Sequence, residues 1–181
     1  MKKRLSIAAW IDKLNERVGR GVAWLSAVLV LVVVIDVFSR YFLNDTAAWV
    51  MELEWHLFAL IFLLAAGYTF RHDKHVRVDL FYVNFSPKDK ALVNVVGAAV
   101  LLLPWLGVLI YSSTAYAYQA WLIREGSPDP GGLPARYLIK AAIPLGLGLL
   151  FLQGVAEGIK NLVILRSPSA EQSENTTHHE A

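Results

Sequence analysis

The hydrophobic pattern of this chain consists of long uncharged runs separated by short charged segments. The central run extends from Trp55 to Phe70, with Glu52 and Glu54 before it and Arg71 directly after it. An ionised side chain costs roughly 3 kcal/mol at the centre of a membrane-spanning helix, so charges gather at the helix ends. Residues 50–70 would form a helix of about 31 Å, which matches a hydrocarbon core roughly 30 Å thick.

Three further segments have the length and apolarity of spanning helices. The first contains eight consecutive aliphatic residues, from Val28 to Ile35. The third span of the chain begins after Ser86 and Pro87, a pair typical of a capped helix start. It contains Pro104, where we expect a kink. The sequence therefore predicts an all-α integral membrane four-helix bundle within residues 21–165, with spans at about 21–43, 50–70, 88–123 and 135–164.

Both ends of the chain are more polar than the runs between them. In residues 1–20, apolar residues recur at helical spacing opposite a charged face, which predicts an amphipathic N-terminal helix lying in the membrane interface. A signal peptide is the alternative, but the charges extend to Arg20 and the following run is long enough to span. Residues 166–181 are polar and lack aromatic residues, which predicts a disordered tail. The apolar positions of the N-terminal helix are Ile7, Trp10, Ile11, Leu14 and Val18.

Composition narrows the class of protein. The chain is 56% hydrophobic and 18% charged, which is too apolar for a soluble domain of 181 residues. The absence of cysteine excludes disulfides, thiolate metal sites and cysteine nucleophiles. The sequence contains no glycine-rich phosphate loop, zinc-protease helix or serine-hydrolase elbow, so neither an enzyme nor a cofactor is predicted. The net charge of +2 gives no indication of a nucleic-acid partner.

The distribution of basic residues predicts the orientation in the membrane. Thirteen of the 17 Lys and Arg residues lie on the side that carries both termini and residues 71–90. Because cytoplasmic segments are enriched in Lys and Arg, both termini are expected in the cytoplasm. The loop at residues 124–134 would then face outward. The four basic residues on the outward side are Arg40, Arg124, Arg136 and Lys140.

Ionisable residues gather in the outer third of the first two spans. Asp36 and Arg40 are four positions apart on one helix face, as are Glu52 and His56. Glu52 and Glu54 lie about 200° apart around their helix, so they cannot both face one partner. We expect one glutamate to meet Arg40 across the hairpin as an ion-pair latch. A contact with a partner protein and a proton or ion relay are the alternatives.

The charged segment after the second span contains side chains of metal-ligand type. Their spacing fits no metal motif and their basic neighbours oppose a cation, so no metal site is predicted. The preferred interpretation is a basic surface that faces lipid headgroups. The ligand-type residues are His72, Asp73, His75 and Asp79, and the basic neighbours are Arg71, Lys74 and Arg77.

The middle of the predicted membrane domain carries few polar groups. The first three spans offer almost nothing polar there, and the fourth offers Gln153 and, nearer the cytoplasm, Glu157. Secondary transporters bind solutes and ions near the midplane with polar groups and broken helices, so any solute pathway is expected in another protein. Gly146, Gly148 and Gly154 should allow close helix approach in the fourth span.

Several short sequence motifs lie near the ends of the predicted spans, and their combination resembles that of a known family. They are Arg40-Tyr41, Trp49 with Glu52 and Glu54, His-Val-Arg-Val-Asp at residues 75–79, and residues 131–136. With four spans, this pattern resembles the DctQ-like small membrane subunit of TRAP transporters (tripartite ATP-independent periplasmic transporters) over about residues 15–165. The 75–79 element is its most specific part. Family members often carry two adjacent acids after the tryptophan, whereas Leu53 separates the two glutamates here.

The resemblance implies a division of labour among three proteins. A periplasmic binding protein captures the solute, and a large permease subunit carries it with a sodium gradient. The small subunit is a non-catalytic scaffold among the lipids of the bacterial inner membrane. A self-sufficient homo-oligomeric channel or exporter and a membrane assembly or sensory protein are the alternatives. Candidate structural or partner-contact residues are Asp36, Arg40, Trp49, Glu52, Glu54, His75, Arg77, Asp79 and Arg136.

Overall fold

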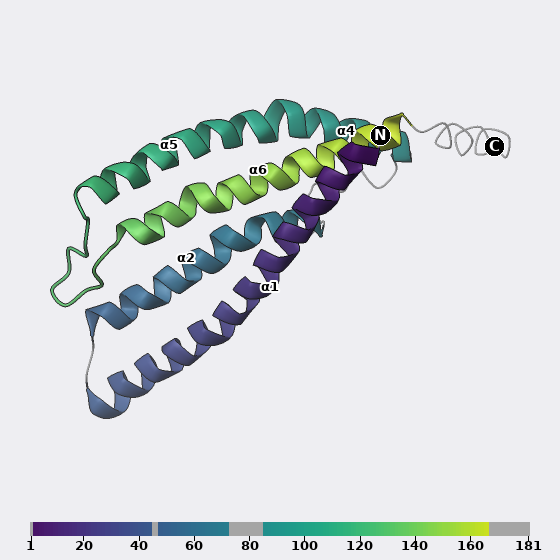
Figure 1. The fold of residues 1–181 in the computed structure, drawn as a ribbon. Coiled ribbons are helices and arrows are strands. Elements are labelled where there is room, and N and C mark those ends of the chain that lie inside the picture. Colours follow the sequence, from purple (N-terminus) through teal and green to yellow (C-terminus); the bar gives the residue numbers. More distant parts are fainter. Residues whose placement is uncertain (1, 45–46, 73–84, 167–181) are drawn as a thin grey trace.

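The computed structural model describes residues 2–44, 47–72 and 85–166, and these contain helices and no strand (Figure 1). This confirms the all-α class. Four helical stretches in the described ranges are long and apolar enough to cross a bilayer, so the chain is a multi-pass membrane protein. The α-helices are α1 (Lys2–Phe38), α2 (Ala48–Arg71), α4 (Pro87–Val96), α5 (Leu103–Leu122) and α6 (Tyr137–Leu165), and the π-helical segments are η1 (Ser39–Leu43) and η2 (Gly97–Leu102).

α1 is one uninterrupted helix of 37 residues. The sequence had indicated an interfacial helix up to residue 20 and a separate span from residue 21, and the structure joins the two. The helix continues into η1 and ends at Asn44, whose φ of 51° places it in the left-handed region. The Asn44 N–H donates to the carbonyl of Ser39. α1 therefore carries an extra N-terminal portion beyond the length that a bilayer requires.

The third membrane-spanning stretch combines α4, η2 and α5. Ser86 is the N-cap of α4, and its hydroxyl accepts the Asp89 N–H at 3.2 Å, which confirms the capped start predicted from the sequence. Pro104 lies in the first turn of α5, directly after the π-helical turn of η2. Proline has no N–H to donate, so the regular hydrogen-bond ladder is interrupted there. Figure 1 shows the helix arching over α6 in this region.

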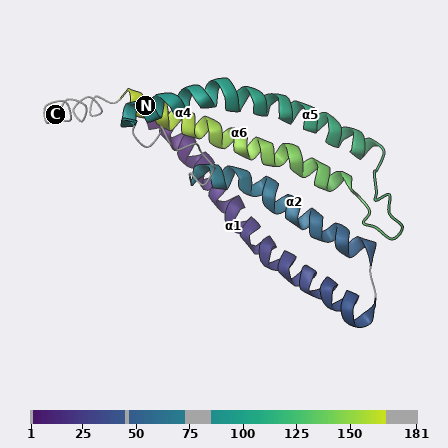
Figure 2. The ribbon, with the colours of Figure 1, turned by 180° about the vertical axis from the view of Figure 1, so that it is seen from behind.

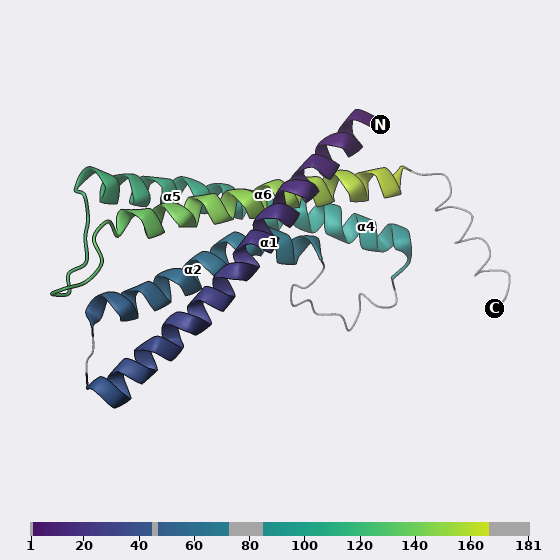
Figure 3. The same ribbon diagram turned by 60° about the horizontal axis from the view of Figure 1, so that its bottom comes forward.

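The helices form an open layer in the order α5, α6, α2, α1 (Figures 1 and 2). α6 packs along both α2 and α5, α1 packs along α2, and the N-terminal part of α1 crosses α6 (Figure 3). The α1–α2 and α5–α6 connections lie at one end of the layer, and the N-terminus and the end of α6 lie at the other. The expected four-helix bundle thus takes the form of an open layer that is one helix thick except where α1 crosses α6.

Small residues allow the central helices to approach closely. A Cβ atom on Gly146 would lie 2.5 Å from the backbone oxygen of Leu63, so no larger residue fits where α6 meets α2. A Cβ on Gly154 would meet Leu102 at 3.1 Å. Gly148, by contrast, has no atom within 4 Å of that position. Gly146 and Gly154 therefore lie where another helix packs closely against α6, whereas Gly148 does not.

The open layer leaves large apolar side chains exposed on both faces. Even in α6, the most enclosed helix, only 28% of the most apolar stretch is buried. Trp24 on α1, Phe62 on α2 and Leu101 on η2 are each 70% exposed or more. A surface of this extent is stable only against lipid or another apolar protein surface.

Candidate functional site

A buried carboxylate of α2 holds the loop that joins α5 to α6. Glu52 is 4% exposed. Its Oε1 accepts the hydroxyl of Ser127, and its Oε2 accepts the backbone N–H of Leu133 at 2.6 Å. Both donors belong to the loop at residues 123–136. A single side chain of the second span therefore fixes a connection more than 70 residues further along the chain.

The loop is also closed by its own hydrogen bonds. The Ser127 N–H donates to the Leu133 carbonyl at 3.1 Å, and the Gly132 N–H donates to the Asp129 carbonyl at 3.0 Å. A Cβ on Gly132 would lie 2.8 Å from Glu52 Oε2, so a glycine is needed for the carboxylate to come this close. Asp129 and Pro130 are exposed at the tip. The result is an ordered loop with a protruding polar end.

The predicted latch across the first hairpin is not present among the described side chains. Arg40 pairs with Asp36 on the same helix, and Asp36 is buried. Glu52 turns to the loop, and the Oε1 atom of Glu54 is buried without a hydrogen-bond partner in the described part of the chain. The prediction was wrong because Asp36, one turn before Arg40, is a nearer partner than either glutamate across the hairpin.

Other predicted residues lie at the same end of the layer or outside the described ranges. Trp49 lies in the first turn of α2 and is 48% exposed. Arg136 is the N-cap of α6, and its guanidinium lies 5.3 Å from the centroid of the Trp55 ring. The 75–79 element, with His75, Arg77 and Asp79, lies outside the described residues. The structure thus brings Arg136 to the end of the layer where Glu52 holds the loop.

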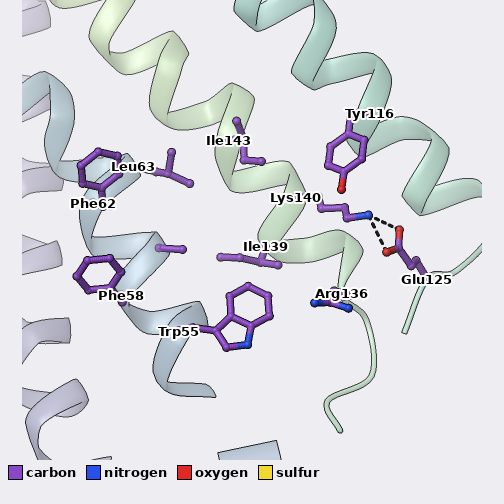
Figure 4. A pocket seen from close by; sticks show the side chains of 11 residues that line it. Trp55, Phe58, Phe62, Leu63, Tyr116, Glu125, Arg136, Ile139, Lys140 and Ile143 are labelled. Atoms are coloured by element: carbon purple, nitrogen blue, oxygen red, sulfur yellow. Dashed lines mark hydrogen bonds and ion pairs between the residues drawn. The ribbon is translucent and has the colours of Figure 1, made fainter. Parts of the chain in front are cut away.

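An open groove of about 650 Å³ lies between α2, α5 and α6 (Figure 4). Aromatic and aliphatic side chains of α2 and α6 form its floor. At its mouth, Lys140 Nζ lies 2.5 Å from Glu125 Oε2 and 4.2 Å from the centroid of the Tyr116 ring. Charged groups therefore stand at one end of an otherwise apolar surface. The residues drawn in Figure 4 include Trp55, Phe58, Phe62, Leu63, Ile139 and Ile143.

A second groove, of about 580 Å³, is wholly apolar in its side chains. Its α6 residues include Leu152, nine positions after Ile143 of the first groove. Nine residues make about two and a half helical turns, so the two grooves lie on opposite sides of α6. The lining residues are Val18, Leu64, Pro144, Leu145, Gly148, Leu149, Phe151 and Leu152.

At the other end of the layer, the crossing of α1 over α6 buries a polar network. The Asn15 side-chain amide donates to Gln153 Oε1 at 2.9 Å, and Gln153 Nε2 donates to Asp12 Oδ1 at 2.8 Å. Lys160 Nζ lies 2.9 Å from Asp12 and 2.8 Å from Glu157. Asn15 and Gln153 are both fully buried. Each of these side chains has at least one polar partner, but the buried Asn15 Oδ1 accepts no hydrogen bond from the described residues.

A second set of contacts ties α2 to the same part of α1. Arg71 Nη1 donates to Glu16 Oε2 at 2.6 Å and to the carbonyl of Asp12 at 3.0 Å. Asp12, Asn15 and Glu16 therefore turn their polar side chains toward α2 and α6. Sequence reasoning noticed Gln153 and the charged face of residues 1–20. It expected this helix to lie in the membrane interface and did not connect its charged face to other helices. The spacing of Asp12, Asn15 and Glu16 on one helix face was the available signal.

No group of three or more potential ligands for a metal ion occurs among the described residues. Of the ligand-type residues that follow the second span, His72 alone lies in the described ranges. It lies 3.5 Å from Glu16 and belongs to the contacts between α2 and α1.

Comparisons with known proteins identify similar sequences. Residues 29–163 match the family described as tripartite ATP-independent periplasmic transporters, DctQ component. A protein of Vibrio cholerae serotype O1, named C4-dicarboxylate TRAP transporter small permease protein DctQ, is 24% identical over 149 residues. The aligned region covers 71% of this chain and 64% of that relative, so the chain spans less than two thirds of the relative's length.

Proposed function

Because the chain belongs to the family of DctQ components of tripartite ATP-independent periplasmic transporters, we propose that it is a non-catalytic scaffold for the large permease subunit of a solute importer. The match covers residues 29–163 and so includes parts or all of the four membrane-spanning stretches. The family makes the chain a small permease subunit in the membrane. In this proposal the large subunit carries the solute, and a sodium gradient drives the transport.

The open single layer of helices is the observation that carries this proposal. A layer one helix thick over most of its extent encloses no passage between the described helices of one copy of the chain (Figure 1). Gln153, the polar residue nearest the middle of the fourth span, is fully buried and hydrogen-bonded to Asn15 and Asp12. It therefore supports helix packing rather than solute binding. An apolar layer without a pathway suits a subunit that covers and braces another membrane protein.

The second groove is the proposed contact with the large permease. Its lining is apolar, and Pro144 and Gly148 are smaller than the leucine and phenylalanine side chains of α6 around them. Membrane helices associate most closely where small residues let the backbones approach. A spanning helix of the large permease could pack into this groove without burying a charged side chain of this chain.

The N-terminal part of α1 is proposed to lie along the cytoplasmic interface of the bacterial inner membrane. Asp12, Asn15 and Glu16 face α2 and α6. Ile7 and Trp10, by contrast, are 49% and 63% exposed. Tryptophan and aliphatic side chains on an exposed helix face favour contact with lipid at the level of the headgroups. The excess of Lys and Arg at this end of the layer supports a cytoplasmic position for both termini.

The loop held by Glu52 is proposed to help dock a periplasmic binding protein. Docking favours a surface that is already ordered, because less conformational entropy is lost on binding. The loop is closed by its own hydrogen bonds and exposes Asp129 and Pro130. It also lies at the end of the layer opposite the start of α1 and the end of α6 (Figure 1).

Co-purification tests the scaffold role. The full chain, co-expressed with a candidate large TRAP permease and solubilised in mild detergent, should recover that permease at a ratio of about one to one. Gly148→Leu fills the second groove and should reduce this recovery. Gly107→Leu is the matched control, because Gly107 and Gly148 both have open space around them and only Gly148 lines the groove. Recovery of the chain only as a stable oligomer of itself would contradict the proposal and favour a homo-oligomeric channel.

A further inference from the structure

The groove between α2, α5 and α6 differs chemically from the groove on the other side of the layer. Phe58 and Phe62 of α2 and Ile143 of α6 line its apolar part (Figure 4). Lys140, Glu125 and Arg136 stand at its mouth, whereas the second groove has no charged lining residue. A volume of about 650 Å³ is in the range of small-molecule sites. This combination of an apolar trough and a charged end requires an occupant with the same two parts.

Two cations at the mouth differ in how they are neutralised. Lys140 is paired with Glu125 at 2.5 Å. Arg136 has no carboxylate within ion-pair distance among the described residues, and its guanidinium lies over Trp55. Glu52 is near enough to interact with its charge, but both Glu52 oxygens are occupied by the loop. Arg136 therefore retains donors for an anionic group from outside the chain.

Aromatic side chains indicate that the mouth lies at the level of the lipid headgroups. Trp55 and Tyr116 line the groove next to the charged residues. Trp121 and Tyr137 meet edge to face close by, with ring centroids 4.9 Å apart. Tryptophan and tyrosine gather where the hydrocarbon core meets the headgroups. The apolar part of the groove then extends into the hydrocarbon, alongside the acyl chains.

We propose that this groove binds one phospholipid from the leaflet that the α5–α6 loop faces. The lipid phosphate would be held by Arg136, and one acyl chain would lie along Phe58, Phe62 and Ile143. Arginine binds phosphate through paired N–H donors, which a lysine cannot provide. A protein helix is a poorer occupant, because it would cover the Lys140–Glu125 pair and remove its solvation.

Lipid binding by the purified full chain tests the proposal. After lipids are removed in detergent, native mass spectrometry would follow the binding of added phosphatidylglycerol. Wild-type protein should bind one molecule more tightly than the rest, and diacylglycerol with the same acyl chains should bind much more weakly. Arg136→Gln should weaken that first binding event roughly tenfold. Arg166→Gln, at the exposed far end of α6, is the matched control and should bind like wild type.

A second variant and a mapping experiment distinguish a loss of lipid binding from a misfolded Arg136→Gln variant. Ala59 lines the groove, so Ala59→Phe should fill it and weaken lipid binding without removing a charge. A phospholipid with a photoactivatable acyl chain should label the chain near Phe58 and Phe62, in the isolated protein and in its complex with the large permease. Equal binding by wild type and Arg136→Gln, or equal binding of diacylglycerol, would overturn the proposal. A photo-crosslinking amino acid at position 62 that reacts with the large permease and not with lipid would also overturn the proposal.

Discussion

The side-chain amide of Asn15 donates a 2.9 Å hydrogen bond to Gln153, 138 residues further along the chain, and both side chains are fully buried. This contact fixes where α1 crosses α6. The carbonyl oxygen of the same amide lies against Gly67, where a Cβ would be only 2.2 Å away. α1, α2 and α6 therefore meet at one point. This is the only place in the described layer where three spanning helices are joined by a fully buried pair of polar side chains.

Gln153→Leu should weaken this junction. The remaining acceptors for the Asn15 amide are two backbone carbonyls at 3.4 Å, which are poor partners. We expect a loss of about 1–3 kcal/mol in the free energy of unfolding. Unfolding by dodecyl sulfate in mixed micelles, followed by circular dichroism, measures this difference. Gln119→Leu removes the same group from an exposed position on α5 and should change stability little.

Gly146→Ala should separate α6 from α2. The added Cβ would lie 2.5 Å from the Leu63 backbone oxygen, and a backbone atom cannot move aside as a side chain can. We expect a loss of about 1–3 kcal/mol and a lower unfolding midpoint in the same assay. Gly148→Ala, two residues later, meets no atom within 4 Å and should be neutral or stabilising by up to about 1 kcal/mol, because alanine favours helix. Equal effects of the two substitutions would contradict the packing described for α6.

Sequence reasoning predicted which segments are helical but not which faces meet. A helix that is hydrophobic on all sides is recognised from its composition alone. The capping of α4 by Ser86 could be predicted because its hydroxyl is bonded to an N–H only three residues away. Gly146, Gly148 and Gly154 looked equivalent in the sequence, and only the packing of α2 and α5 distinguishes them. In a membrane the apolar pattern carries no direction, because lipid and protein interior are both apolar.

The candidate site was predicted only in part. Glu52 was selected as a candidate, but its partners Ser127 and Leu133 lie more than 70 residues away and no local rule connects them. The network around Asp12 and Lys160 was missed, because charged residues near an end of the chain are ordinarily solvated. Partners that come from distant helices are fixed by tertiary packing, which spacing along the sequence does not reveal.

Glu52→Gln should loosen the α5–α6 loop while leaving the helices folded. Glutamine keeps one acceptor oxygen but presents an NH₂ group where the second donor now approaches. Hydrogen exchange at residues 127–133 should rise several-fold, with little change in the helices. Glu54→Gln is the matched control, because the buried Glu54 Oε1 accepts no hydrogen bond from the described residues. An unchanged loop in Glu52→Gln would show that the backbone contacts of the loop suffice.

The proposed orientation predicts which ends of the layer a membrane-impermeant reagent reaches. The chain has no native cysteine, so a single introduced thiol is the only labelling site. Asp129→Cys, at the tip of the α5–α6 loop, should react with an impermeant maleimide added to intact cells. Arg166→Cys, at the end of α6, should react only after the membrane is permeabilised. Labelling in the reverse order would place both termini outside and contradict the cytoplasmic assignment.

The thinness of the layer affects how its tolerance to substitution should be measured. Leu101 and Trp105 are 70% and 66% exposed, so in the isolated chain they behave as surface positions. In a cell, lipid or a neighbouring protein covers them, and the same residues then have the packing demands of an interior. A scan of substitutions should therefore give two different maps, one from the solubilised chain and one from the chain in its membrane. Positions that are sensitive only in cells will outline the surfaces through which this subunit meets its neighbours.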